Sequence, residues 1–168
     1  MMRDWILENA SIIVGLILLA LAGSIIAVGF STARTSGLAS EITLIESSAR
    51  GGFAQSNQGY ANFTTANAAD LATGGMFPQN MVRNGVLYDD WGNAIQLSSA
   101  NNGTNGVIAF GGGGSESVDS CKTVVTGLKD YVSLVVANST FTQSTQPDAL
   151  SAEQACAGGT ATIALTFQ

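Results

Sequence analysis

The chain opens with an apolar run that passes into an amphipathic pattern. Residues 10–30 carry no charge, and a helix of about 21 residues spans roughly 31 Å. Beyond this run, apolar side chains recur three and four positions apart, as in a helix with one buried face; they are Leu38, Ile42, Ile45, Ala49 and Phe53. The pattern predicts one helix from about Asp4 to Phe53, ended by Gly51-Gly52, within an N-terminal domain of residues 1–53.

This helix has an apolar half over about 5–32 and an amphipathic half over about 33–53. The apolar half is long enough to cross a membrane, and three interpretations are open: a cleaved secretory signal, a permanent anchor, or a segment that leaves the membrane and is buried in an assembly. The motif Ala20-Leu21-Ala22 is compatible with cleavage, but Asp4 and Glu8 oppose Arg3 in the flank that a signal peptide needs to be basic. We therefore expect the segment to be retained.

Residues 54–168 are predicted to form one globular head domain with an antiparallel sheet. Residues 54–84 are rich in Asn, Gly, Thr and Ala and indicate a loop, with a possible helical turn over 66–72. Alternating runs separated by Gly and Asn turns predict strands over 86–89, 94–98 and 107–110. Further strands are expected over 131–137 and 160–167, with a loop over 141–148. The fold class is α+β.

Two short helices are expected in the head. Ser115 is the predicted N-cap of the first, with Glu116 and Asp119 in its first turn. Its apolar stripe has helical spacing and consists of Val118, Cys121, Val125 and Leu128. Ser151 and Gln154 have the capping-box spacing and open the second helix, which stops at Gly158-Gly159.

The chain has two cysteines, Cys121 and Cys156, and each lies in one of these predicted helices. An even number in an exported domain favours one disulfide, whereas in a cytosolic protein the pair would be free thiols. The apolar N-terminal segment favours the exported case.

The amino-acid composition disfavours several classes of function. Only 11% of residues are charged, against roughly 25% in ordinary soluble domains, which indicates a neutral, hydroxyl-rich surface that is partly covered. The net charge of −6 disfavours direct nucleic-acid binding. The chain has no His, the commonest general base and metal ligand. We expect no enzyme activity, no cofactor and no metal.

Three further motifs are weak. The segment "GGGGSES" at 111–117 precedes a helix but lacks the Lys of a phosphate-binding loop, so we interpret it as a mobile connection. The Asn-x-Thr motifs at Asn62, Asn102 and Asn138 indicate exposed loops. Three acidic residues could together bind a hard cation, but we expect them to be solvated residues that form turns; they are Asp89, Asp90 and Glu116.

Glu8 stands at the edge of the apolar run. An ionised group there is costly unless it is paired or reaches the membrane interface. Glu8 is therefore either the interfacial group of a monomeric anchor or a charge partner for another subunit.

Four segments together resemble the type IV pilins, and within them the type IVb pilins of Gram-negative bacteria. "WILENASIIVGLILLALAG" resembles the N-terminal pilin helix, in which Glu precedes about twenty apolar residues, and "YDDWGNAIQL" resembles the turn that enters the pilin sheet. "SESVDSCKTVVTGL" and "SAEQACAGGTATIALTF" resemble the segments that enclose the C-terminal disulfide region of the family. The match extends over essentially the whole chain.

The resemblance implies a pilin fold, in which a long N-terminal helix packs against an antiparallel sheet, with short additional helices and a Cys121–Cys156 disulfide. It implies a major pilin subunit that forms a helical filament of identical copies, in which Glu8 neutralises the terminal amine of a neighbour. The Pro found in many pilin helices is absent; Gly15, Gly23 and Gly29 weaken this helix and would permit local extension.

By the same resemblance, the chain lies in the inner membrane before assembly and in an extracellular pilus afterwards. Its expected partners are copies of itself, the pilus assembly machinery and a prepilin peptidase. The alternatives are a minor pilin, a secretion-system pseudopilin, or, in another class, a monomeric membrane-anchored periplasmic binding domain. The sequence does not select among adhesion, aggregation, DNA uptake and conjugative mating as the role of the filament.

Overall fold

The computed structural model describes residues 37–53 and 55–168. These residues lie in the second of the two units into which the chain divides, Thr35–Gln168. The apolar half predicted over about 5–32 lies outside the described residues, and the predicted domain boundary at residue 53 remains a prediction. Within 37–53 and 55–168, no helix combines the length and the apolar character needed to cross a membrane.

Residues 37–53 form a helix whose predicted buried stripe is confirmed. Every stripe residue is at most 8% exposed, so this face is part of the core. Gly51 and Gly52 lie inside the last described turn of the helix. They do not end it before Phe53.

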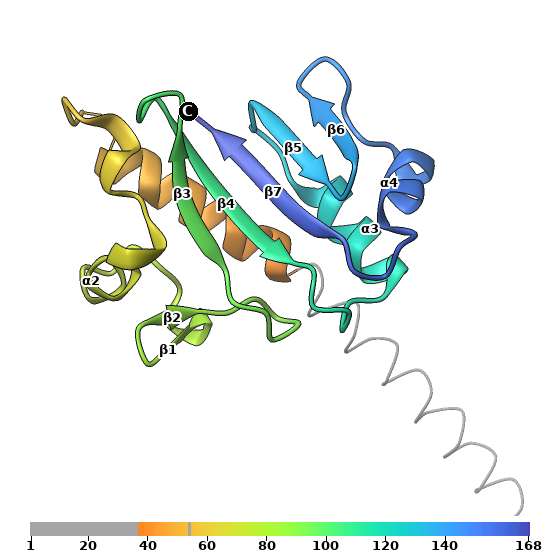
Figure 1. Cartoon of the computed structure of the whole chain (residues 1–168), viewed down its shortest axis with the longest axis horizontal. Coiled ribbons are helices and arrows are strands. Elements are labelled where there is room, and N and C mark those ends of the chain that lie inside the picture. Colours follow the sequence, from red (N-terminus) through yellow and green to blue (C-terminus); the bar gives the residue numbers. More distant parts are fainter. Residues whose placement is uncertain (1–36, 54) are drawn as a thin grey trace, which may run out of the picture. The chain divides into compact units, whose positions relative to one another are not determined.

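A five-stranded antiparallel sheet forms the centre of the head (Figure 1). Its strands are β3 (Gln96–Ala100), β4 (Asn105–Gly111), β5 (Ser133–Val136), β6 (Ser139–Thr142) and β7 (Thr162–Phe167). The spatial order is β3-β4-β7-β5-β6. The last strand of the chain therefore lies between two hairpins that precede it, and it completes the sheet.

The core lies between this sheet and the helix 37–53, which passes behind the strands in Figure 1. The inward-facing strand residues are fully or almost fully buried; they include Leu97, Ile108, Phe110, Leu134, Ile163 and Leu165. An aromatic cluster closes one end, with ring centroids of Tyr60 and Phe167 5.2 Å apart and edge to face. Burying one large apolar side chain contributes about 1.5–3 kcal/mol, so this interface is the main source of stability.

The predicted loop over 54–84 contains more structure than expected among its described residues. Its elements are η1 (Gly59–Asn62), η2 (Thr65–Asn67), α2 (Ala68–Thr73), η3 (Gln79–Met81) and β1 (Val82–Arg83). The strand predicted over 86–89 is present as the shorter β2 (Val86–Leu87). The helical turn expected over 66–72 is confirmed in η2 and α2. Asn84 and Gly85 join β1 to β2 with φ of 51° and 77°, as the tightest hairpin turns require.

Two helices complete the head, α3 (Val118–Gly127) and α4 (Ala149–Cys156), and both begin differently from the prediction. The N-cap of α3 is Ser117, whose Oγ accepts the Ser120 backbone N–H at 3.1 Å. The N-cap of α4 is Asp148, which forms a capping box with Ser151. The predicted caps, Ser115 and the Ser151/Gln154 pair, were therefore wrong. The side chains of Ser117 and Asp148 instead accept the backbone N–H groups at the starts of these helices.

The predicted loop over 141–148 is also partly wrong, because β6 covers Ser139–Thr142 and pairs with β5. Phe141 is the one large apolar residue in this segment, and it pairs with Leu134. A single apolar residue is too short a pattern to indicate a strand, so the hairpin depends on its partner.

Candidate functional site

The structure tests only part of the predicted set of site residues. Glu8, Gly15, Gly23 and Gly29 lie outside the described residues, so their roles stay predictions. The Cys121–Cys156 disulfide is confirmed, with Cα atoms 5.9 Å apart. Both cysteines are 1% exposed, and the bond joins α3 to the end of α4.

The face of the helix 37–53 that points away from the core carries no charge. Its exposed residues recur at helical spacing and are small, apart from one leucine; they are Ser40, Thr43, Leu44, Ser47, Ser48, Gly51 and Gly52. Leu44 is 57% exposed. We call this set the helix strip.

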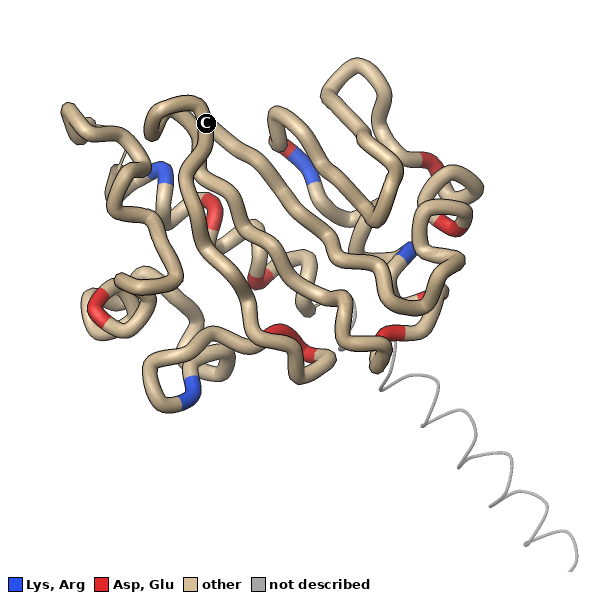
Figure 2. The backbone as a smooth tube through the Cα atoms, viewed as in Figure 1, with Lys and Arg blue, Asp and Glu red and all other residues tan. Residues whose placement is uncertain are grey.

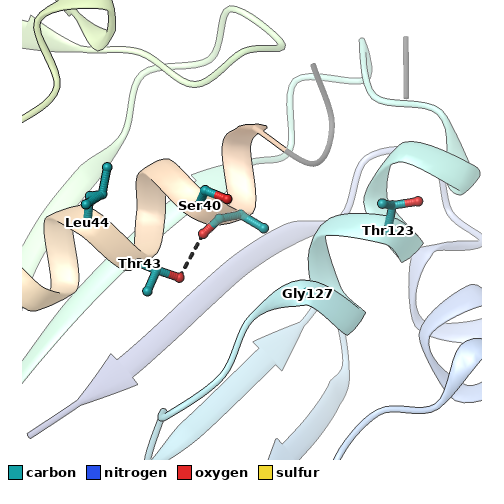
Figure 3. A pocket seen from close by; sticks show the side chains of 6 residues that line it. Ser40, Thr43, Leu44, Thr123 and Gly127 are labelled. Carbon is teal, nitrogen blue, oxygen red and sulfur yellow. Dashed lines mark hydrogen bonds between the residues drawn. The ribbon is translucent and has the colours of Figure 1, made fainter. Parts of the chain in front are cut away.

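An open groove lies between the helix strip and α3 (Figure 3). Its volume is about 510 Å³, and α3 contributes Thr123 and Gly127 to its wall. A Cβ at Gly127 would lie 3.2 Å from the Ala39 Cβ, so the absence of a side chain brings the two helices close together. The groove is shallow, uncharged and lined by small side chains, features that suit packing against another helix.

An ion pair between a buried carboxylate and a partly exposed guanidinium lies on the other flank of this helix. Glu46 is 1% exposed, and its Oε1 lies 2.7 Å from Arg50 Nη2. Arg50 also donates to the backbone carbonyl of Gln168 at 2.8 Å and to that of Asp130 at 2.6 Å. Arg50 thereby ties the helix to the last strand and to the loop after α3.

The surroundings of Glu46 favour its neutral form. Burial raises the pKa of its carboxyl from 4.5 to about 7, while the Arg50 guanidinium lowers it and the Asp130 carboxylate raises it. The charge on this buried group therefore changes near neutral pH.

Asp89, predicted to be a solvated turn former, is instead a buried acceptor, so that prediction was wrong. It is 2% exposed. Its carboxylate accepts the backbone N–H groups of Trp91 at 3.0 Å, Asn93 at 2.7 Å and Gly111 at 2.9 Å. These bonds stabilise the turn before β3 and attach it to the end of β4.

Glu116 has a related role in the glycine-rich loop after β4. It is 5% exposed, and its Oε1 accepts the Gly112 backbone N–H at 2.7 Å. It lies before α3 and not in the first turn of that helix. The loop predicted to be a mobile connection is therefore attached at Gly111 and Gly112 to two buried carboxylates, which serve as backbone acceptors.

The described residues form surfaces suited to packing against another protein, but few arrangements of side chains suited to catalysis or metal binding. Among residues 37–53 and 55–168, no cluster of three or more Cys, Asp or Glu side chains is placed to hold a metal ion. The surface features that differ from the rest of the head are the uncharged helix strip, the groove beside it and the sheet. The groove could not be predicted from the sequence, because its two walls are about eighty residues apart in the chain and only their side-by-side packing creates it.

Comparison with known proteins agrees with this geometry. Residues 32–168 match the family described as PilS N terminal. The chain belongs to this family. A search of curated protein sequences found no match.

Two solved structures share the fold of this family member. The type IVb pilin from Salmonella typhi has a TM-score of 0.58 at 18% identity, over 79% of this chain and 97% of that one. TcpA, a type IV pilin from the Vibrio cholerae El Tor biotype, has a TM-score of 0.54 at 16% identity, over 80% of this chain and 97% of that one. The predicted α+β pilin fold is confirmed.

Proposed function

We infer that this family member is a pilin, a structural subunit that polymerises into an extracellular type IV pilus. The observation that carries this proposal is the division of one helix into two faces. The inward face is buried in a pilin-fold head, and the outward helix strip is uncharged and bordered by a groove. A helix of this kind can pack against neighbouring copies without bringing charges into contact.

The apolar half predicted over about 5–32 would enter the filament core. An apolar helix that leaves a membrane needs equal burial elsewhere, and a bundle of identical helices supplies it. A head-to-tail contact between identical chains that does not close into a ring generates an open helical polymer. The inner membrane would hold the chain before assembly, and the assembly machinery and a prepilin peptidase would act on it there.

Glu8 would pair with the terminal amine of a neighbouring copy in this polymer. A carboxylate placed in an apolar bundle is costly without a partner, so the pairing would select the correct register between copies. Gly15, Gly23 and Gly29 would allow the helix to extend locally inside the filament.

Substitution at Glu8 tests the proposal. Glu8→Ala should reduce surface filaments at least about tenfold, because a missing charge partner costs more than 1.4 kcal/mol. The membrane-inserted chain should remain at its normal level. Filaments are counted by electron microscopy of sheared surface material, and the chain is quantified by immunoblotting of membranes.

The other classes give different results in the same experiment. A minor pilin or a pseudopilin would be a trace component of filaments built from another chain. A monomeric periplasmic binding domain would be absent from sheared material altogether, and Glu8→Ala would not change its distribution. Normal filaments from Glu8→Ala would remove the charge-pairing role and leave the polymer itself supported.

A further inference from the structure

The chain contains three Asn-Gly pairs, and each pair lies in different surroundings. The pairs are Asn84-Gly85, Asn102-Gly103 and Asn105-Gly106. An Asn side chain that precedes Gly reacts readily with the next backbone nitrogen, because Gly has no side chain to hinder the approach. The reaction needs a backbone that can rotate, so the packing around each pair decides whether it proceeds.

Asn84-Gly85 forms the two-residue turn between β1 and β2. The Asn84 side chain is exposed, and both turn residues have positive φ. The two strands are joined by only two residue pairs. Among the backbone hydrogen bonds of the described turns and loops, none is donated by Gly85. A two-stranded hairpin this short opens at low cost, and opening allows the backbone at Asn84 to rotate.

The second pair, Asn102-Gly103, is held on both sides by its neighbours. Asn102 is exposed, but Gly103 is buried, and the Gly103 N–H donates to the Ala100 carbonyl at 3.1 Å. The Gly103 carbonyl accepts the Tyr60 N–H at 2.7 Å. The nitrogen that would have to attack is therefore already hydrogen-bonded, and its residue is fixed to another segment of the head.

The third pair, Asn105-Gly106, lies inside the central sheet. Asn105 is 5% exposed, and its Oδ1 accepts a hydrogen bond from Asn101 Nδ2 at 2.9 Å. Gly106 pairs with Ser99 on β3 and with Phe167 on β7. A Cβ on Gly106 would lie 2.4 Å from Phe167 Cζ, so the ring packs directly on this backbone. Rotation here would require strands of the central sheet to separate.

We propose that Asn84 is a site of spontaneous deamidation, and that the fold suppresses the same reaction at Asn102 and Asn105. In the first step the Gly85 nitrogen loses its proton and bonds to Asn84 Cγ, while the Cγ–Nδ2 bond breaks and this nitrogen leaves as ammonia. In the second step water opens the resulting cyclic imide at either carbonyl, which gives aspartate or isoaspartate. The reaction consumes water, releases ammonia and needs no oxidant or reductant.

Deamidation changes the charge of the hairpin. The β1–β2 hairpin carries the basic Arg83 and no acidic residue (Figure 2). The new carboxylate is ionised at neutral pH, so the hairpin becomes neutral overall and the net charge of the chain, −6, gains one further negative unit. The Arg83 guanidinium lies 5.6 Å from the centre of the Tyr88 ring, and a carboxylate on the next residue competes with the ring for it.

The isoaspartate product also changes the shape of the turn. Isoaspartate directs the backbone through the side-chain carbon and lengthens it by one atom, so the turn no longer matches the register of β1 and β2. The Tyr88 N–H donates to the Met81 carbonyl at 2.8 Å at the base of the hairpin, and this bond should weaken in the isoaspartate product. The aspartate product keeps the turn, because Asp-Gly suits the same turn type as Asn-Gly.

Ageing of the purified full-length chain tests the proposal. The detergent-solubilised chain is incubated for days at mildly alkaline pH, which favours the deprotonated nitrogen. A protease that cuts before aspartate then yields residues 70–88, which contain Asn84, and residues 90–118, which contain the other two pairs. Mass spectrometry measures the deamidated fraction at each position. The fraction at Asn84 should exceed the fractions at Asn102 and Asn105 by about tenfold or more.

Unfolding and substitution provide the controls. In denaturant the three pairs should react at similar rates, because each Gly is followed by Val or Thr and the local sequences are alike. Asn84→Gln should prevent the new acidic form in isoelectric focusing, because the longer side chain closes the ring far more slowly. Asn84→Asp should reproduce the charge of the aged chain and keep the Tyr88 N–H protected from hydrogen exchange, whereas the aged wild type should lose part of this protection.

The same measurements define the results that would overturn the proposal. Equal deamidated fractions at the three pairs in the folded chain would show that the fold does not control the reaction. An unmodified Asn84 in the folded chain, under conditions in which the denatured chain reacts at all three pairs, would show that the hairpin does not open. An acidic form that still accumulates in Asn84→Gln would assign the new charge to another residue.

Discussion

At the scale of single residues, three buried carboxylates supplement the apolar core with specific local connections in the head. Glu46, Asp89 and Glu116 are each at most 5% exposed, and burial of a charge is costly without partners. Asp89 and Glu116 accept backbone N–H groups, whereas Glu46 has a neighbouring guanidinium. Each carboxylate joins segments that are separate in the sequence or stabilises a turn.

Asp89→Ala should destabilise the head by about 3 kcal/mol, because buried backbone donors would lose a charged acceptor. The matched control is Asp90→Ala, since Asp90 is exposed and should cost less than about 1 kcal/mol. Chemical denaturation of the detergent-solubilised chain, followed by tryptophan fluorescence, measures both. Equal effects at the two positions would show that the buried hydrogen bonds are not the cause.

Glu46 should make stability depend on pH. Its pKa is raised from 4.5 to about 7 in the folded chain, so its contribution is fully present below about 4.5 and is lost as pH rises through 7. Between pH 5 and 8 the folded state should lose up to about 3 kcal/mol from this group. Glu46→Gln should flatten the profile of melting temperature over this range. An equally steep profile in Glu46→Gln would assign the dependence to other groups.

At the scale of elements, α3 and α4 are too short to be stable alone. They have 10 and 8 residues, and isolated helices shorter than about 12 residues are marginal in water. Their N-caps, their mutual packing and the Cys121–Cys156 bond therefore maintain them. α3 also forms one wall of the groove, and the disulfide bonds α3 to α4.

Removing the disulfide should destabilise the head by about 3 to 4 kcal/mol, the chain-entropy contribution of a loop of this size. The double variant Cys121→Ser, Cys156→Ser should denature at the same lower midpoint with and without reductant. The wild type should reach that midpoint only when reduced. A wild-type midpoint that does not respond to complete reduction would show that the bond adds no stability.

At the scale of the whole molecule, one helix stabilises the head on one side and presents the helix strip on the other. Because the two faces are separate, a substitution on the strip can affect assembly without affecting folding.

Leu44→Glu should reduce filament yield at least about tenfold while it changes the free energy of unfolding by less than about 1 kcal/mol. Leu44 is 57% exposed, so it contributes little to the head core. The matched control is Leu150→Glu on α4, where the leucine is 65% exposed; its filament yield should stay near wild type. Filament yield from sheared cells and denaturation of the solubilised chain separate assembly from folding.

The spacing of apolar residues was sufficient to predict the parts of the fold that depend only on residues close together in the sequence. The buried stripe from Leu38 to Phe53, the stripe around Cys121 and the strand at the C-terminus follow from spacing of three, four or two residues. The disulfide followed from the number of cysteines and the apolar segment. The pilin fold followed from the resemblance of four segments, and the comparisons confirmed it.

Only the tertiary structure decided the features that depend on distant residues. The central place of β7, the burial of Asp89 and the groove beside Gly127 all join segments far apart in the chain. Hydrophobic periodicity records which face of an element is buried, but it does not record which partner buries it. For this reason the sequence by itself determined the helix and its inner face, whereas the surfaces available for assembly emerged only when the sheet and helices were packed together.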